Sequence, residues 1–226
     1  MEINIVTLFP EMVEQALDHS ILKRAQDRSL LAVRTVNPRD FATDAHRTVD
    51  DSPYGGGPGM VMKPEPIHAA LLSLGLPEPS TILMPDPTGP VFDQEWALRL
   101  ATEPTITLVC GHYEGIDDRI RQRWKAQPVS IGDFVLTGGE LAALTIIDAV
   151  GRLIPGVLGN EQSLDIDSHS DGLLSAPQFT RPEVWDGLSV PEVLTTGDHG
   201  KIAKWRRAQA LRVTRDHRPD LFARAR

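Results

Sequence analysis

The chain has 226 residues, of which 24% are charged and 41% are apolar, and its formal net charge is −8. This composition is ordinary for a globular protein, no apolar run reaches the roughly 18 residues of a membrane span, and no basic stretch with an apolar signal core opens the sequence. We therefore expect a cytoplasmic protein with one main core and a second small domain. The single cysteine, Cys110, cannot form an internal disulfide, which agrees with a reducing compartment.

The first elements along the chain are predicted to be a strand, a helix and a second strand. Residues 3–9 form an apolar run with β-branched members, and residues 11–27 then follow a helical pattern. Residues 30–36 form the second β-branched run. No Gly-x-Gly-x-x-Gly follows the first strand, so a dinucleotide-binding Rossmann domain is disfavoured.

Residues 37–67 are polar and then rich in Gly and Pro, which predicts a long loop that is either functional or disordered. Within it, PYGGGPGM at 53–60 contains too many glycines for a helix, and no Gly-Lys-Ser/Thr follows, so it is not a phosphate loop. Its glycines either let a flat group approach the backbone closely or make a flexible hinge.

The next segments alternate between helix and strand. Helices are predicted at 66–74 and 92–101, and strands at 80–84 and 105–110, and a further helix begins near Asp117. This alternation indicates an α/β fold with a mostly parallel sheet.

Three loops are expected to meet around one cleft, because ligands of such sheets bind beyond the carboxyl ends of the strands. These loops are PDPTGP at 85–90, GHYEG at 111–115 and IGDFVLTGG at 131–139. The glycines of the third loop allow tight turns and a close approach to a ligand. An almost wholly apolar helix is predicted at 140–150, with Arg152 close to its end.

The composition changes after Gly159. Residues 160–172 are polar and acidic, which predicts an interdomain linker, and a basic helix is expected at about 200–216. Residues 201–226 contain nine Lys or Arg and two Asp, a charge of +7, which leaves −15 on the first 200 residues. A basic patch on an acidic body is a footprint for polyanions, although a solvated terminal helix would show the same charge.

Seven strings resemble the bacterial tRNA (guanine-N1)-methyltransferase family, nearly end to end and in the family's order. They are LFPEM, RDF with HRTVDDSPYGGGPGMVMKPEP, CGHYEGIDDRI, IGDFVLTGGELAA, DAVGRLIPGVLG, DSHSDGLLSAPQFTRPEVW and VPEVLTTGDHGKIAKWRRAQAL. The resemblance implies a knotted methyltransferase of the SPOUT class, which binds S-adenosylmethionine in a deep trefoil knot and methylates N1 of guanosine 37 in tRNA. It also implies a homodimer whose active sites are shared between subunits.

The resemblance divides the chain into a knotted methyltransferase domain at 1–159, a flexible linker at 160–172 and a small, mainly helical, basic tRNA-binding domain at 173–226. Carried over by motif, the residues that contact S-adenosylmethionine are Met84, Pro85, Asp86, Pro87, Gly111, Tyr113, Glu114, Gly115, Ser130, Ile131, Gly132, Phe134, Val135, Leu136, Gly138 and Gly139. The chain departs from the usual pattern at Met84–Asp86, Phe134 and Ala142, and we expect altered donor affinity without loss of the site.

The resemblance assigns the chemistry to Asp167 as general base and to Arg152 as the group that stabilises charge on the guanine. Guanine N1 is a poor nucleophile until its hydrogen leaves, so a carboxylate and a cationic donor suit this reaction. From the residues alone, Asp167 is a solvated linker residue and Arg152 forms an i,i+4 pair with Asp148. His169 stands where the family often has phenylalanine, and we expect Asp167 to be unordered before tRNA binds.

RNA contacts are expected in two places. Residues 53–60 would receive the flipped guanine, and the basic segment would contact phosphates beside Trp205. The predicted RNA-binding residues are Tyr54, Gly55, Gly56, Gly57, Lys201, Lys204, Arg206 and Arg207.

No metal site is predicted, because the histidines and the cysteine lack zinc-binding spacings. Asp50, Asp51 and Glu114 offer carboxylates for Mg²⁺ or an RNA-bound ion. His112 is a rival general base, but a loop histidine with a backbone hydrogen bond is the simpler interpretation. Two other functions remain open: a knotted methyltransferase for another RNA position, and an RNA-binding module without catalysis.

Overall fold

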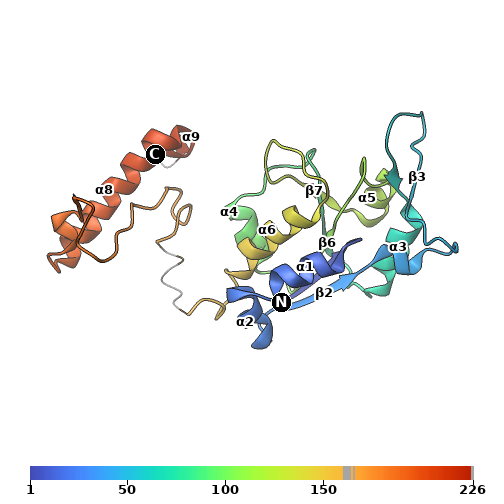
Figure 1. The fold of residues 1–226 in the computed structure, drawn as a ribbon, viewed down its shortest axis with the longest axis horizontal. Helices are drawn as coiled ribbons and strands as arrows, with labels where there is room; N and C mark the ends of the chain where they lie inside the picture. The colour runs from blue at the N-terminus through green and yellow to red at the C-terminus, as the bar shows by residue number, and fades with distance from the viewer. Residues whose placement is uncertain (160–163, 165, 225–226) are drawn as a thin grey trace. The chain divides into compact units, whose positions relative to one another are not determined.

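The structure is a computed structural model that describes residues 1–159, 164 and 166–224. The chain divides into two compact units, Met1–Gly159 and Asn160–Arg226 (Figure 1). Part of the predicted linker, 160–163 and 165, lies outside the described residues, as does Arg226 of the basic segment.

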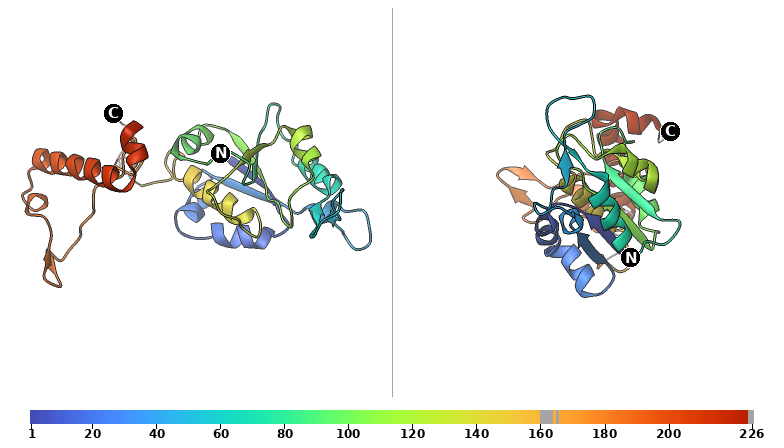
Figure 2. Two further views of the ribbon diagram at one scale, coloured as in Figure 1. Left: turned by 90° about the horizontal axis from the view of Figure 1, so that it is seen from above. Right: turned by 90° about the vertical axis from the view of Figure 1, so that its right-hand side faces the viewer.

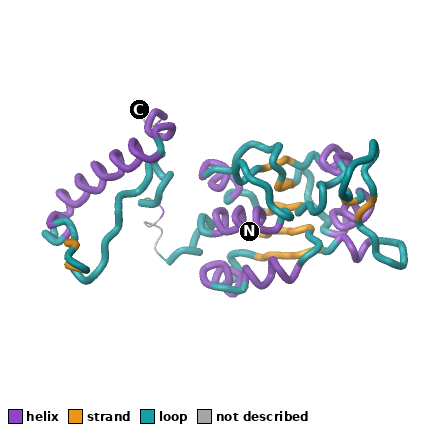
Figure 3. Tube along the Cα trace, turned by 45° about the horizontal axis from the view of Figure 1, so that its top comes forward, coloured by secondary structure: helices purple, strands orange, loops and turns teal. Residues whose placement is uncertain are grey.

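The first unit is built on a sheet of five parallel strands in the order β2-β1-β6-β5-β7. Apolar and β-branched residues predominate in the three central strands β1, β6 and β5, as expected for strands that are covered on both faces. Their bounds are β1 Glu2–Val6, β2 Ala32–Val36, β5 Thr81–Pro85, β6 Thr105–Val109 and β7 Gln127–Val129. The prediction of a parallel α/β fold followed by C-terminal helices is confirmed (Figures 1 and 3).

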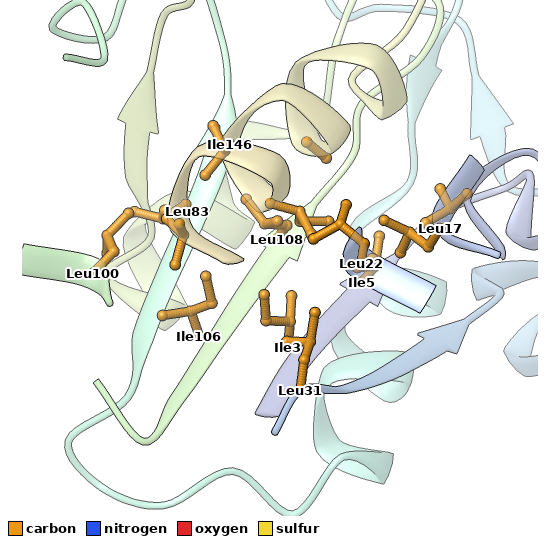
Figure 4. Close-up of a cluster of buried hydrophobic side chains, with 14 of the residues drawn as sticks. Ile3, Ile5, Leu17, Leu22, Leu31, Leu83, Leu100, Ile106, Leu108 and Ile146 are labelled. Atoms are coloured by element: carbon orange, nitrogen blue, oxygen red, sulfur yellow. The ribbon is translucent and has the colours of Figure 1, made fainter. Parts of the chain in front are cut away.

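Helices pack on both faces of this sheet (Figure 2). One face contributes Ile3, Leu108 and their neighbours to a core with the buried sides of α1, α2, α4 and α6, and Figure 4 shows Ile146 of α6 above Leu83 and Leu108. The other face packs against α3 and α5 through Ile67, Leu71 and Ile120. These helices span Pro10–Leu17 (α1), Ser20–Asp27 (α2), Pro64–Ser73 (α3), Gln94–Leu100 (α4), Asp118–Trp124 (α5) and Glu140–Gly151 (α6).

A pair of buried polar residues lies in the middle of the sheet. Asn4 of β1 and Thr107 of β6 are register partners, and each is only 1% exposed. The side-chain oxygen and nitrogen of Asn4 and the hydroxyl of Thr107 have no hydrogen-bond partner among the described residues. Unpaired buried polar atoms destabilise a fold, so this pair is a local weakness of the sheet.

The helix predicted at 11–27 is two helices. The first ends at Leu17, and Ser20, the first residue of α2, has a left-handed φ of 52°. A serine with positive φ is uncommon, and it breaks the continuous helical path that the apolar periodicity predicted.

The segment predicted to be one long loop contains three short elements. Residues Pro38–Phe41 form a 3-10 helix, and Asp50–Asp51 (β3) pairs with Val61–Met62 (β4) in an antiparallel ladder. The loop between β3 and β4 extends away from the sheet (Figures 1 and 2). The glycine-rich stretch is therefore the tip of a hairpin.

The second unit contains a small hairpin and a long basic helix. Its elements are β8 Val184–Trp185, β9 Leu188–Ser189, a 3-10 turn at Glu192–Leu194, α8 His199–His217 and α9 Pro219–Arg224. Helix α8 confirms the helix predicted at about 200–216. Its buried Thr214 accepts a hydrogen bond from the Leu174 amide, 2.9 Å away, which attaches the preceding chain to the helix.

Candidate functional site

A cleft of about 440 Å³ opens at the carboxyl ends of β6, β5 and β7, and we call it the three-loop cleft. These strands are neighbours in the sheet, so the loops that follow them converge. The lining includes every residue predicted to contact the methyl donor, on the loops that follow β5, β6 and β7. The predicted meeting of the three loops is confirmed.

The first wall of the cleft, residues 85–90, is fastened to β7 by its backbone. The Asp86 amide donates to the Val129 carbonyl at 2.9 Å, and the Asp86 carboxylate accepts from the Thr88 amide at 2.8 Å. A Cβ at Gly89 would stand 2.4 Å from the Val129 nitrogen, closer than real contacts allow. Only glycine therefore lets this turn pack so tightly on the neighbouring strand.

The second wall, residues 111–115, includes a residue in an unusual conformation. Tyr113 has a left-handed φ of 60°, which is uncommon for a residue other than glycine and is found more often at functional sites. Its hydroxyl lies 3.5 Å from Nη2 of Arg39. The Tyr113 ring is half exposed, so it offers an aromatic surface at the edge of the cleft.

The third wall, residues 131–139, joins the second through two adjacent glycines. The Gly139 amide donates to the Gly111 carbonyl at 2.9 Å, and Gly138 forms an antiparallel bridge with His112. Phe134 and Val135 on the same wall are 54% and 87% exposed. The wall combines a fixed glycine backbone with apolar side chains that remain free for a ligand.

The two predicted catalytic residues lie away from this cleft or in the other unit. Arg152 is the C-cap of α6, whereas Gly139, the N-cap of that helix, and Ala142 in its first turn line the cleft. The twelve residues of α6 span about 18 Å, which separates Arg152 from the end of the helix that lies at the cleft. Arg152 is accordingly not among the described residues that line the cleft of its own chain. Asp167 belongs to the second unit, where its carbonyl accepts from the Ser170 hydroxyl at 2.8 Å.

The glycine-rich hairpin tip ends directly against the second wall. The Glu114 amide donates to the Met60 carbonyl at 2.9 Å, and a Cβ at Gly59 would stand 2.2 Å from the Glu114 carboxylate. At Gly55, Gly56 and Gly57 nothing lies within 4 Å of such a Cβ, but each has a positive φ. Backbone conformation requires these three glycines, and Tyr54 beside them is fully exposed.

The predicted RNA-binding residues of the second unit lie on α8. Arg207 forms an ion pair with Asp171, and Lys201 lies 3.3 Å from Asp198, the N-cap of the helix. Lys204 and Arg206 are exposed on the same helix. These cations are available to phosphates, since surface ion pairs of this kind are weak.

Among the described residues, no group of three His, Cys, Asp or Glu side chains is arranged to hold a metal ion. The carboxylates of Asp50, Asp51 and Glu114 thus form no such group. His112 differs from the expected loop histidine, because its ring bonds to the buried carboxyl group of Glu140 at 2.6 Å. Within the same part of the chain, no helix is long and apolar enough to cross a membrane.

Although Thr88, His112 and Thr137 belong to the three predicted loops, several residues that line the cleft were not among the predicted donor contacts. They are Thr88, His112, Ile116, Asp118, Arg121, Pro128, Val129, Thr137 and Ala142. Most of them adjoin a predicted residue, so extending each motif by one position would have found them. Asp118 and Arg121 open helix α5, and only the fold places that helix beside the cleft.

Comparison with known proteins now decides the family. Residues 1–224 match the family model described as tRNA (Guanine-1)-methyltransferase TrmD. The chain belongs to this family. Its enzyme class is therefore tRNA (guanine-N1)-methyltransferase, as the seven strings predicted.

Curated relatives of the TrmD family agree over almost the whole chain, and each is named a tRNA (guanine-N(1)-)-methyltransferase. The relative from Chloroflexus aggregans is 53% identical over 229 residues, and the match covers 100% of this chain and 89% of the relative's length. The relative from Staphylococcus carnosus is 53% identical, and the match covers 99% of this chain and 91% of the relative's length. The relative from Frankia alni is 53% identical, and the match covers 100% of this chain and 86% of the relative's length.

Proposed function

We propose that the protein transfers the methyl group of S-adenosylmethionine to N1 of guanosine 37 in tRNA, with the donor bound in the three-loop cleft. The single observation that carries this proposal is the convergence of all the donor motifs on that one cleft. Its volume lies in the range of small-molecule sites, and its glycine backbone with exposed Phe134 and Val135 suits a flat nucleoside. S-adenosylmethionine supplies a methyl group that is activated on a sulfonium.

The guanine is proposed to bind at the glycine-rich hairpin tip. Its exposed Tyr54 offers a ring for stacking, and three positive-φ glycines leave the backbone open to the face of a base. The hairpin end at Gly59 contacts Glu114 of the second wall, so donor and acceptor sites would adjoin. This arrangement supports an in-line transfer between them.

In the proposed mechanism, the Asp167 carboxylate takes the proton from guanine N1. The nitrogen pair then forms the new N–CH₃ bond as the C–S bond breaks, and S-adenosylhomocysteine leaves with the sulfur electron pair. The Arg152 guanidinium stabilises the negative charge that spreads onto O6. Both roles come from the family motifs, and the order of Asp167 before tRNA binds stays a prediction.

A homodimer with shared sites is part of the proposal. Arg152 lies about a helix length from the cleft of its own chain, so a partner subunit that supplies it would explain the family's assignment. Exposed Phe9, the N-cap of α1, together with Met12 of α1 and Leu141 of the neighbouring α6, offers an apolar surface for that partner. The deep trefoil knot and the three-part division at 159 and 172 belong to the same proposal.

The main experiment incubates undermodified tRNA with methyl-labelled S-adenosylmethionine and analyses the nucleosides. We expect label in 1-methylguanosine at position 37 and a loss of at least about a hundred-fold in turnover for Asp167→Asn and Arg152→Ala. Glu183→Gln, which changes an exposed carboxylate of the same unit, is the control. Full turnover by either variant would refute its catalytic role, and label in another nucleoside would favour a different RNA position.

A second experiment tests the RNA footprint of helix α8. Replacing Arg206 and Arg207 by Gln should weaken tRNA binding and reduce the slope of log affinity against log salt by about one to two, because fewer counterions are released. Replacing Arg212 and Arg215 by Gln removes the same amount of charge from the same helix and serves as the control for net charge. An unchanged slope in the first variant would contradict the footprint.

A further inference from the structure

A buried polar network joins three elements beside the three-loop cleft. Glu140, at the start of α6, is 2% exposed, and each of its carboxyl oxygens is hydrogen-bonded. Thr7, directly after β1, donates its hydroxyl to Oε1 at 2.6 Å. Nε2 of His112, on the second wall, lies 2.6 Å from Oε2.

The network is fixed at both ends. The Thr7 hydroxyl also accepts the Phe9 amide at 3.0 Å, so both of its hydrogen-bonding roles are used. The His112 ring packs on the Phe9 ring with centroids 4.8 Å apart. Helix α6 starts at Glu140, where its dipole favours a negative group. Each member is therefore restricted to one position.

The same atoms determine how closely the second and third walls approach. A Cβ at Gly138 would stand 2.2 Å from Cε1 of His112 and 2.7 Å from the Glu140 carboxylate. The Gly139 amide bonds to the Gly111 carbonyl one residue before His112. Moving His112 off Glu140 would leave the backbone bridge between the walls without its side-chain support.

We infer that His112 and Glu140 are positioning residues, which set the spacing of the second and third walls and thereby the affinity for the methyl donor, and that Thr7 orients Glu140 for this task. The inference rests on the proposed donor site. Thr7 is fully buried and absent from the cleft lining, so it acts on the donor only through Glu140 and Phe9.

The test measures the Kd of S-adenosylmethionine for the full-length protein by calorimetry. We expect His112→Ala and Thr7→Val each to raise Kd about ten-fold, as loss of a hydrogen bond to a buried carboxyl group does. Because both act through Glu140, the double variant should raise Kd by less than the product of the single effects. Thr7→Ser keeps the hydroxyl and should restore wild-type Kd.

A kinetic split separates positioning from general damage. Thr7→Val should raise KM for the donor while kcat at saturating donor stays within about two-fold of the wild type. The control is His68→Ala in the same unit, where Nδ1 accepts a 3.0 Å hydrogen bond from Trp124 Nε1 outside the cleft. That variant should lower the thermal midpoint and leave the donor Kd unchanged.

Two outcomes would overturn the inference. Kd within about two-fold of wild type for both His112→Ala and Thr7→Val would exclude positioning, and so would an equal rise of Kd in His68→Ala. Gly132→Trp separates this failure from that of the donor site, because Gly132 lines the cleft and an indole there would fill it. If Gly132→Trp binds the donor normally, the proposed donor site fails; if it alone loses binding, only the positioning role fails.

Discussion

Gly139 lies directly against the backbone of Cys110, so that a Cβ at position 139 would stand 2.8 Å from the Cys110 Cα. Both are buried, and the contact joins the start of α6 to the end of β6. We expect Gly139→Ala to destabilise the first unit by about 1–3 kcal/mol, since neither backbone can move without disturbing the core. Thermal unfolding measures the effect.

Gly159→Ala is the control for that substitution, because nothing lies within 4 Å of its Cβ. It should leave the thermal midpoint nearly unchanged. If Gly139→Ala unfolds at the same thermal midpoint as Gly159→Ala, the backbones at Gly139 and Cys110 can move apart at little cost, which would contradict the prediction.

The Cys110 thiol is expected to be inert in the folded protein. Burial raises its pKa well above the ordinary value, and the negative charge of Glu140 adds to the rise. The thiolate that reacts with disulfide reagents is thus scarce and shielded. A chromogenic disulfide should label no thiol at about pH 8 in the native state and one per chain in denaturant, since the chain has one cysteine. Rapid native labelling would contradict this burial.

Removing the unpaired polar groups in the sheet should stabilise the protein. Asn4→Leu with Thr107→Val replaces three buried atoms that have no partner among the described residues. We expect a gain of about 1–3 kcal/mol in the free energy of unfolding, measured by urea titration. Thr7→Val, whose hydroxyl has two partners, should lose stability in the same assay. A loss in both variants would show that Asn4 and Thr107 are paired in solution.

Acid should weaken the start of helix α5. The hydrogen bond from the Arg119 side chain lowers the pKa of Asp117, the N-cap of this helix. A lowered folded-state pKa contributes stability above the unfolded value of about 3.8, and that contribution is lost as pH falls through the folded value. Asp117→Asn should therefore lower the thermal midpoint at neutral pH, and the difference from wild type should shrink as pH falls below the ordinary aspartate value of 3.8. A difference independent of pH would contradict this assignment.

The sequence was sufficient for the main strands, because buried parallel strands are continuous apolar runs. It also placed the three walls together, since loops at one edge of a parallel sheet must converge. Strand β7, at 127–129, was not predicted, because its proline and glutamine do not resemble a buried strand. The hairpin at 50–62 was missed because each of its strands has two residues.

The network of Thr7, Glu140 and His112 was also beyond the sequence. Its members are separated by 28 to 133 positions, and no local pattern links them. Glu140 begins a helix that the sequence predicted only as apolar, and the structure shows its carboxyl group almost completely buried. Arg152 is the opposite case: the resemblance predicts a role for it, and only the fold shows how far it lies from the cleft of its own chain.

The walls of the cleft contact one another through glycine backbone at Gly89, Gly138 and Gly139. Met84 and Phe134, where the sequence led us to expect departures from the usual family pattern, contribute side chains to the lining instead. Substitution can therefore alter the lining while the frame stays in place. An inhibitor that binds the backbone amides and carbonyls of the frame should be less sensitive to resistance mutations than one that relies on the Phe134 ring.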